Sequence, residues 1–322
     1  MMSQPNETPA EQLKARLQAS MGAHIDAIAY VPGDIERLAG PSLDAAPAPA
    51  PEAQSAAKPR SLAEMINAHY DFVFYADDSS WSEMLSETQF RNLGYWGPGI
   101  DTLDLAGRRL QDELLALLPE KTGRILDVAC GMGASTARLA EQFGPENVWA
   151  INISEMQIES TRKNAPGCTA MVMDAVDMTF EDGFFDAIEC IEAAFHFDTR
   201  RAFLDEALRV LKPGGRMVAS DVLMTSADRL DQHPIFPGSE NHIATPEEYR
   251  ALLEEVGFVD IAIRDARPEI WRGHFLHTVN GFHAGYFDRK YDLVQLNRML
   301  WAFYEIDAIT GPCLILSATK PG

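Results

Sequence analysis

The segment RILDVACGMGAST, Arg124 to Thr136, joins a short apolar run to a glycine-rich turn. The run has the length and composition of a buried strand. The residues after the turn continue into an amphipathic pattern that ends at Gly144, which is typical of a helix and its C-terminal stop. The segment therefore predicts a strand–turn–helix unit, and in open α/β sheets that corner usually contacts a ligand.

The residues of the turn narrow the choice of ligand. Glycine-rich turns after strands hold nucleotide phosphates, dinucleotides or the adenosyl-amino acid S-adenosylmethionine (SAM). A phosphate-binding loop needs a lysine after its glycines, and here Ala134 follows Gly133. A dinucleotide turn needs a third glycine and an acid about 20 residues further on, where this chain has Thr136 and Asn152. Taken alone, the turn indicates a nucleotide-type ligand and leaves a purely structural turn open.

Strand-like and helix-like segments alternate along most of the chain. This alternation predicts an α/β fold with a parallel sheet and helices on both faces. We then expect the ligand at the carboxyl ends of the strands. The strand-like segments are 124–130, 147–153, 168–175, the start of 184–197, 216–224, 259–266 and 311–319, and the helix-like ones are 102–119, 134–144, 154–165, 200–211 and 245–258.

Composition excludes some classes of partner. The net charge of −21, from 48 acidic and 27 basic residues, argues against binding to nucleic acid or to an anionic membrane surface. No apolar run is long enough to span a bilayer, and the polar N-terminus has no signal peptide pattern. The four cysteines lack paired spacing, which favours free thiols and a cytoplasmic location.

The chain divides by composition into four parts. We expect residues 1–40 to be an extension that is either disordered or a docking element, and the Ala/Pro-rich residues 41–60 to be a linker. Residues 61–118 are expected to form a helical cap, and 119–322 the main α/β domain. The aromatic segment at about 267–309 is interpreted as a lid over the substrate, or else as helical core.

The motifs in combination decide the family. ILDVACGMG, INISEMQ, MDAVDMTF, FDAIECIEAAFHF and LKPGGRMVASDV, in that order, resemble the class I SAM-dependent methyltransferases over about residues 62–265. The motifs are most similar to those of the natural-product and quinone methyltransferases. HYD at His69–Asp71 and NLGYW at Asn92–Trp96 add features of the cyclopropane fatty acid synthases. The resemblance implies a Rossmann-like, seven-stranded, mostly parallel sheet with a helical cap and lid, and SAM as cofactor.

The resemblance also implies which residues bind the cofactor. Asp127 would orient the glycine turn and the cofactor's ammonium, Gly131 and Gly133 would let the main chain approach the methionine part, and Asn152 stands where the family commonly has an acid for the ribose. The full expected set is Tyr70, Trp96, Asp127, Gly131, Gly133, Asn152, Ile153, Gln157, Asp174, Ala175 and Glu192. Of these, Ile153, Asp174 and Ala175 would surround the adenine, and Gln157 would reach the ribose or the methionine end.

His196 and Asp221 are the expected catalytic residues. They end the fourth and fifth strands, and related sugar and small-molecule methyltransferases have His and Asp at the matching positions. An imidazole can take a proton near neutral pH, and a neighbouring acid would fix its tautomer. The alternative is that His196 only packs on the cofactor and Asp221 only ends its strand, since SAM is already an activated donor and positioning supplies much of the rate.

The sequence thus predicts a SAM-dependent methyltransferase that acts on an O, N or C nucleophile of a small, largely apolar molecule, such as a secondary metabolite. A lipid C-alkylating enzyme of the cyclopropane-synthase kind, a catalytically silent SAM-binding protein and an NAD-dependent oxidoreductase are the alternatives. No metal site is expected, because His274, His277 and His283 lie in an aromatic segment without cysteine or carboxylate partners in a fixed frame. The sequence leaves open whether the acceptor is carrier-tethered and whether the protein is a homodimer.

Overall fold

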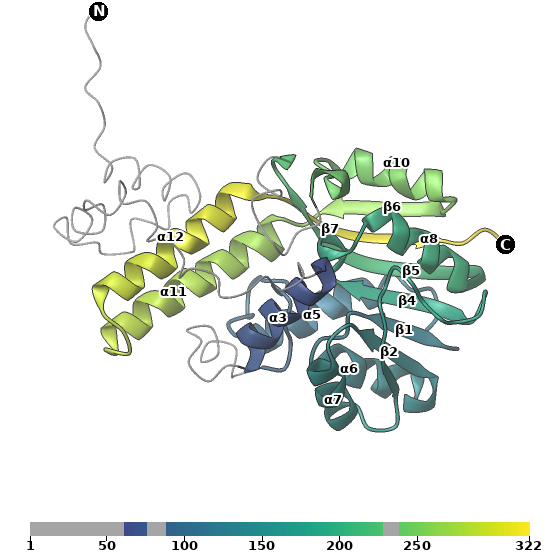
Figure 1. Ribbon diagram of the computed structural model, residues 1–322, viewed down its shortest axis with the longest axis horizontal. Coiled ribbons are helices and arrows are strands. Elements are labelled where there is room, and N and C mark those ends of the chain that lie inside the picture. The colour runs from purple at the N-terminus through teal and green to yellow at the C-terminus, as the bar shows by residue number, and fades with distance from the viewer. Residues whose placement is uncertain (1–60, 76–87, 228–237) are drawn as a thin grey trace, which may run out of the picture. The chain divides into compact units, whose positions relative to one another are not determined.

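The computed structural model describes residues 61–75, 88–227 and 238–322 (Figure 1). The expected extension and linker, residues 1–60, lie outside this range. The chain divides into two compact units: one holds residues 60–274 and 309–322, and the described part of the other is residues 275–308. No helix within the described ranges has the length and apolar character needed to cross a membrane.

The larger unit contains a seven-stranded sheet in the order β3-β2-β1-β4-β5-β7-β6. The first five strands pair in parallel, and β7 is antiparallel to both of its neighbours. The strands are β1 (Ile125–Val128), β2 (Val148–Asn152), β3 (Thr169–Val172), β4 (Phe185–Ile191), β5 (Leu211–Met224), β6 (Val259–Asp265) and β7 (Thr310–Thr319). This confirms the predicted mostly parallel α/β sheet, and it puts the switch of strand order between β1 and β4.

Side chains of the central strands alternate between two buried faces, as the strand period of two requires. On one face, Leu126 and Val128 of β1 belong to the main core together with Phe203 and Tyr249. These two aromatic residues come from α8 (Arg200–Val210) and α10 (Pro246–Val256). On the other face, Asp127 contacts α6 (Ala134–Phe143), and α7 (Glu155–Asn164) packs on β2 and β3. Helices therefore cover both faces, which leaves the ends of the strands for a ligand.

Capping residues in the sequence set where the helices begin. The hydroxyls of Ser154, Thr199 and Thr245 each accept a hydrogen bond from a main-chain N–H in the first turn of α7, α8 and α10. Gly257 ends α10 in the left-handed conformation. These helices lie where their sequence patterns predicted them, because both the caps and the apolar stripes are local signals.

Two helices precede β1 within the described residues. The helix α5 (Leu103–Leu115) is amphipathic and buries one face against β5 and β7. The helix α3 (Leu62–Tyr75) has no fully buried residue. It lies beside the carboxyl ends of the strands, and its polar contacts are described with the site below.

The described part of the smaller unit is a helical pair built around aromatic side chains. The helix α11 (Gly273–Phe287) is followed by α12 (Leu293–Ile309), and Phe275 stacks on Phe303 with ring centroids 5.1 Å apart. Phe282 packs edge-on against the same ring. Phe275, Phe282 and Phe303 are thus helical core, one of the two interpretations of the sequence, whereas Phe287 is 72% exposed. The role of a lid over the substrate stays a prediction.

Candidate functional site

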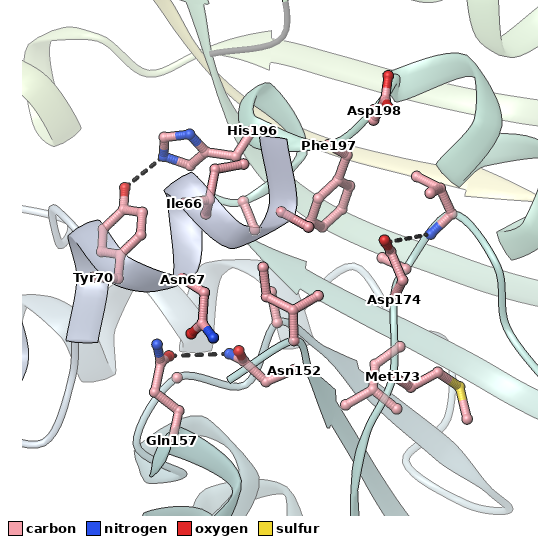
Figure 2. A pocket seen from close by; sticks show the side chains of 18 of the residues that line it. Ile66, Asn67, Tyr70, Asn152, Gln157, Met173, Asp174, His196, Phe197 and Asp198 are labelled. Carbon is pink, nitrogen blue, oxygen red and sulfur yellow. Dashed lines mark hydrogen bonds between the residues drawn. The ribbon is translucent and has the colours of Figure 1, made fainter. Parts of the chain in front are cut away.

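A cavity of about 450 Å³ opens at the carboxyl ends of β1, β2, β3 and β4, beneath α3 (Figure 2). Its volume suits a small organic ligand. The strand-end lining is Ala129, Gly131, Ile151, Asn152, Ile153, Gln157, Met173, Asp174, Ala175, Val176, Ile191, Glu192, Ala193, His196, Phe197 and Asp198. The lining from α3 and its neighbourhood is Ser61, Leu62, Ala63, Ile66, Asn67, Tyr70, Phe74 and Arg91.

Asp127 of β1 anchors the residues that directly follow the glycine turn. Its carboxylate accepts hydrogen bonds from the hydroxyls of Ser135 at 2.8 Å and Thr136 at 2.7 Å, in the first turn of α6. Burial raises the pKa of Asp127 to about 6, against the lowering effect of these two hydrogen bonds. Thr136, which occupies the place of a third dinucleotide glycine, therefore helps to anchor the turn.

Gly131 presents main chain to the ligand space. Its φ is +55°, and a Cβ added there would meet no atom within 4 Å, so it would project into open space. Gly131 also lines a second, small cavity together with Asp127 and Arg91. The turn thus separates two connected spaces without filling either of them.

Amide groups gather at the end of β2. Asn152 Oδ1 accepts from the main-chain N–H of Ser154 at 2.9 Å, and Asn152 Nδ2 donates to Gln157 Oε1 at 3.1 Å. The Ser154 hydroxyl caps α7 and donates to Asp71 of α3 at 2.7 Å. These bonds fix the orientation of both amides at the cavity edge.

The end of β3 forms the far wall of the cavity. Asp174 Oδ1 accepts from the main-chain N–H of Val176 at 3.1 Å, and the buried Ala175 lies between these two residues. Figure 2 shows Asp174 on the side of the cavity opposite Tyr70. Ile153 and Met173 supply apolar surface next to these polar groups.

Glu192, after the end of β4, is a strained and incompletely paired acid. Its φ is +51°, and its Oε2 accepts from the main-chain N–H of Leu93 at 2.6 Å. Its Oε1 is buried and has no hydrogen-bond partner among the described residues. Burial raises the pKa of Glu192 to about 8, and the charge of Asp221 adds to the effect.

His196 is buried in a short helical turn after β4, and its Nε2 lies 2.5 Å from Tyr70 Oη of α3 (Figure 2). The two rings meet edge to face, with centroids 5.2 Å apart. Burial, followed by the charge of Glu192, raises the pKa of the Tyr70 phenol. The phenol therefore keeps its proton at neutral pH and shares a hydrogen bond with His196 Nε2.

Comparison with known proteins identifies the family. A family model described as a methyltransferase domain matches residues 126–219. The 27-O-demethylrifamycin SV methyltransferase of Amycolatopsis mediterranei is 32% identical over 206 residues, which cover 60% of this chain and 72% of that protein. The chain belongs to the class I SAM-dependent methyltransferases. It is a methyltransferase of small organic molecules with SAM as cofactor, and the family excludes the NAD-dependent alternative.

Solved structures of low identity share the methyltransferase fold. The [4+2]-cyclase SpnF has a TM-score of 0.62 and 21% identity, over 81% of this chain and 97% of that one. Phosphoethanolamine N-methyltransferase 2 of Haemonchus contortus, solved with SAM, has a TM-score of 0.58 and 18% identity, over 79% of this chain and 60% of that one. These two similarities establish the fold alone.

The cavity of this methyltransferase fits an adenosyl cofactor by its own chemistry. Open space over Gly131 accepts a ligand close to main chain, and the unpartnered Glu192 Oε1 offers an acceptor. In the described lining of the larger cavity, Asn67 Oδ1 is a second buried acceptor without a partner. Apolar walls at Ile153 and Met173 suit a flat base, and the polar strand ends suit a sugar and an amino acid.

Asp221 was expected beside His196, and this expectation was wrong. Its carboxylate instead forms a buried ion pair with Arg200, the first residue of α8, with Nε to Oδ2 at 2.7 Å. A second bond from Arg200 Nη2 and one from the N–H of Val222 occupy Oδ1. Asp221 thus ties α8 to β5, and Tyr70 takes the place of the partner expected for the imidazole.

Two expected cofactor residues do not line the cavity. Gly133 has φ +88°, and a Cβ there would lie 2.7 Å from Thr161 Cα, so this glycine allows α6 to approach α7. Trp96 is buried in an apolar cluster with Leu103 and Ala106 and donates through Nε1 to Leu93 O. Both residues shape the scaffold of the site and do not face its ligand space. The other expected cofactor residues line one of the two cavities.

Sequence reasoning missed Asn67 and Arg91. Arg91 precedes α5, stacks over Phe74 of α3 at 5.2 Å and lines both cavities. Burial lowers its pKa to about 10, which leaves it charged at neutral pH. The turn itself has no cation, but Arg91 brings one beside it. The i, i+3 spacing of Asn67 from Tyr70 was the available signal for a second α3 residue at the ligand.

Proposed function

We propose that this methyltransferase methylates a hydroxyl oxygen of a natural product, with His196 as the general base acting through Tyr70. The O-methyltransferase relatives support the class of acceptor, since the Amycolatopsis relative is named for a 27-O-demethylated rifamycin. The observation that carries the proposal is the bond of 2.5 Å between Tyr70 Oη and His196 Nε2 in the wall of the cavity.

The proton path follows from this bond. As the acceptor hydroxyl reacts, its proton passes to Tyr70 Oη while the phenolic proton passes to His196 Nε2. The phenol is restored and the imidazole becomes an imidazolium, so protons and charges balance. The buried setting keeps this transfer local, because few solvent molecules can compete for the proton.

SAM, when bound, supplies a methyl group already activated on a sulfonium. The residues that would hold it divide by region. Asp127, Gly131 and Arg91 line the space for the methionine end, and Arg91 offers a cation to a carboxylate. Asn152 and Gln157 would face the ribose, and Ile153, Asp174 and Ala175 would face the base, since all five line the cavity. Glu192 Oε1, a buried acceptor in the same lining, would accept from the cofactor.

The lipid-alkylating alternative has less support. The HYD motif that suggested it has other roles in this proposal, since Tyr70 bonds to His196 in the proton path and Asp71 bonds to Ser154. The four free cysteines are consistent with a protein that works in the reducing cytoplasm.

The proposal is tested with methyl-labelled SAM and a panel of acceptors that carry a hydroxyl, an amine or an activated carbon, each offered free and as a carrier thioester. We expect labelled methyl ether with matching release of S-adenosylhomocysteine. His196→Ala should lower turnover about 10²- to 10⁴-fold. Tyr70→Phe should lower it by a smaller factor, and both variants should keep the SAM affinity. Label on nitrogen or carbon, or full turnover by His196→Ala, would contradict the proposal.

A further inference from the structure

Asn67 directs its side chain from α3 toward the amide pair at the end of β2 (Figure 2). Its Oδ1 is buried and has no hydrogen-bond partner within the described residues. A buried acceptor without a partner lowers stability, so such an atom at a cavity wall indicates a ligand that donates to it.

The hydrogen bonds at the end of β2 show that a ligand there would benefit from a further hydrogen-bond acceptor, which Asn67 can supply. Asn152 Oδ1 and Gln157 Oε1 both already accept a hydrogen bond within the protein. Gln157 Nε2 has no hydrogen bond within the described part of the chain, so this edge mainly offers a donor. A ribose diol carries two O–H groups that need acceptors. The carboxylate that the family commonly uses there is replaced by Asn152, whose amide oxygen already has one partner, so this edge offers fewer free acceptor sites than a carboxylate would.

We propose that Asn67 Oδ1 accepts a hydrogen bond from the ribose diol of SAM and so takes over the role of the missing carboxylate. The inference rests on the proposed placement of the cofactor's ribose beside Asn152 and Gln157. It assigns a cofactor contact to α3, outside the sheet that carries the other ribose residues.

The position of Asn67 gives this contact a further consequence. Asn67 and Tyr70 are three residues apart and line the same cavity, so they share one face of α3. The helix buries no residue fully, and polar bonds such as Asp71 to Ser154 and Tyr75 to Ser160 hold it in place. A ribose bonded to Asn67 therefore stabilises the helix position in which Tyr70 reaches His196, and cofactor binding prepares the general base.

The test is a binding cycle measured by isothermal titration, without turnover. Wild type, Asn67→Ala and Asn67→Asp are titrated with S-adenosylhomocysteine and with its 2′-deoxy and 3′-deoxy analogues. Phe72→Ala, a substitution of an exposed residue on the same helix, is the matched control. Circular dichroism checks that each variant is folded.

We expect Asn67→Ala to bind S-adenosylhomocysteine about tenfold more weakly than wild type, which is ~1.4 kcal/mol. For one of the two deoxy analogues, Asn67→Ala and wild type should bind equally, because the partner of the Asn67 oxygen is gone. Asn67→Asp keeps an acceptor and should restore binding of the parent ligand, and Phe72→Ala should match wild type.

Equal binding of S-adenosylhomocysteine by Asn67→Ala and wild type would overturn the inference. So would a loss in Asn67→Ala that stays undiminished for both deoxy analogues. If wild type fails to bind S-adenosylhomocysteine at all, the placement of the cofactor in this cavity is overturned as well. The two failures are therefore distinguishable.

Discussion

The two sides of the cavity are built differently. The strand-end side, defined by the ends of β1, β2, β3 and β4, belongs to the buried core, and Asp127 there is 1% exposed and bonded to two hydroxyls. The helix side, defined by α3, buries no residue fully and depends on polar bonds across the cavity. We therefore propose that the sheet positions the residues that hold the cofactor, whereas the proposed proton path depends on a helix that is held by a few polar contacts.

The largest effect is expected in the core next to the strand-end side, at Asp221, which ties α8 to β5. Asp221→Ala leaves the buried Arg200 guanidinium without its partner, and breaking such a pair typically costs about 3–5 kcal/mol. Urea unfolding should show this loss directly. Turnover per folded molecule should fall much less than in His196→Ala, because Asp221 does not contact the imidazole.

A double variant serves as the control for that prediction. Arg200→Met with Asp221→Leu removes both charges and should recover most of the lost stability, since apolar replacements of buried ion pairs are often neutral or stabilising. If Asp221→Ala keeps wild-type stability but loses turnover, the acid is a catalytic partner after all, and the original expectation from the sequence would be reinstated.

The glycines of the turn separate scaffold from ligand contact within the strand-end side. Gly133→Ala places a Cβ 2.7 Å from Thr161 Cα at φ +88°, so overpacking of roughly 1–3 kcal/mol adds to a left-handed cost of roughly 1–2 kcal/mol. Gly131→Ala carries only the left-handed cost, because its Cβ meets open space. Thermal unfolding should therefore rank Gly133→Ala below Gly131→Ala.

Ligand affinity should rank the same two variants in the opposite order to their thermal stability. At equal folded concentration, titration with S-adenosylhomocysteine should show the larger loss of affinity in Gly131→Ala, whose methyl group enters the cavity. Equal affinity losses in the two variants would remove the distinction between a packing glycine and a ligand glycine.

The strand-end side was largely predictable from sequence because its signals are local. The strand Ile125–Val128 is apolar except for Asp127, Ser154 is a cap next to its helix, and Asp174 lies two residues after the end of β3. Each of these features can be recognised from a few neighbouring residues in the sequence. Parallel pairing then brings the strand ends together without further information.

The contacts that were missed join segments far apart in the chain. Tyr70 and His196 are 126 residues apart, and no local pattern tells whether the phenol faces the cofactor or the imidazole. Arg200 has the pattern of an ordinary helix cation, yet it is buried against Asp221. The polar partner of a buried charge is decided by packing geometry, which single-sequence patterns do not contain.

Glu192, which lines the cavity after the end of β4, should make the stability of the protein depend on pH. Its pKa is raised from 4.5 to about 8, so the folded protein holds a proton that the unfolded chain releases. The stability that this proton contributes is fully present below about pH 4.5 and is lost as the pH rises through about 8. Wild type should therefore lose stability across this window relative to Glu192→Gln, which stays neutral.

The size of that difference is limited by partial exposure of the side chain. If the folded protein bound one whole proton more than the unfolded chain, the free energy of unfolding would change by ~1.4 kcal/mol per pH unit. We expect a total difference of roughly 1–2 kcal/mol between the two proteins over the whole window. Urea unfolding of both proteins at several pH values measures it. Parallel curves for the two proteins would show that Glu192 is already ionised in the folded state.

The smallest global effect, and the sharpest local one, is expected on the helix side. Asp71→Ala removes the bond to Ser154 Oγ, while the Ser154 hydroxyl remains the cap of α7. One such bond is worth ~0.5–1.5 kcal/mol, so amide hydrogen exchange within α3 should speed up about 2- to 12-fold. The urea midpoint should stay unchanged, since α3 adds no fully buried residue to the core. Ser154→Ala breaks the same bond and the cap together, so it should also speed exchange in the first turn of α7.

If Asp71→Ala shifts the urea midpoint as far as Asp221→Ala does, α3 unfolds together with the sheet. The two sides of the cavity would then belong to one cooperative unit, and the distinction between them would be wrong.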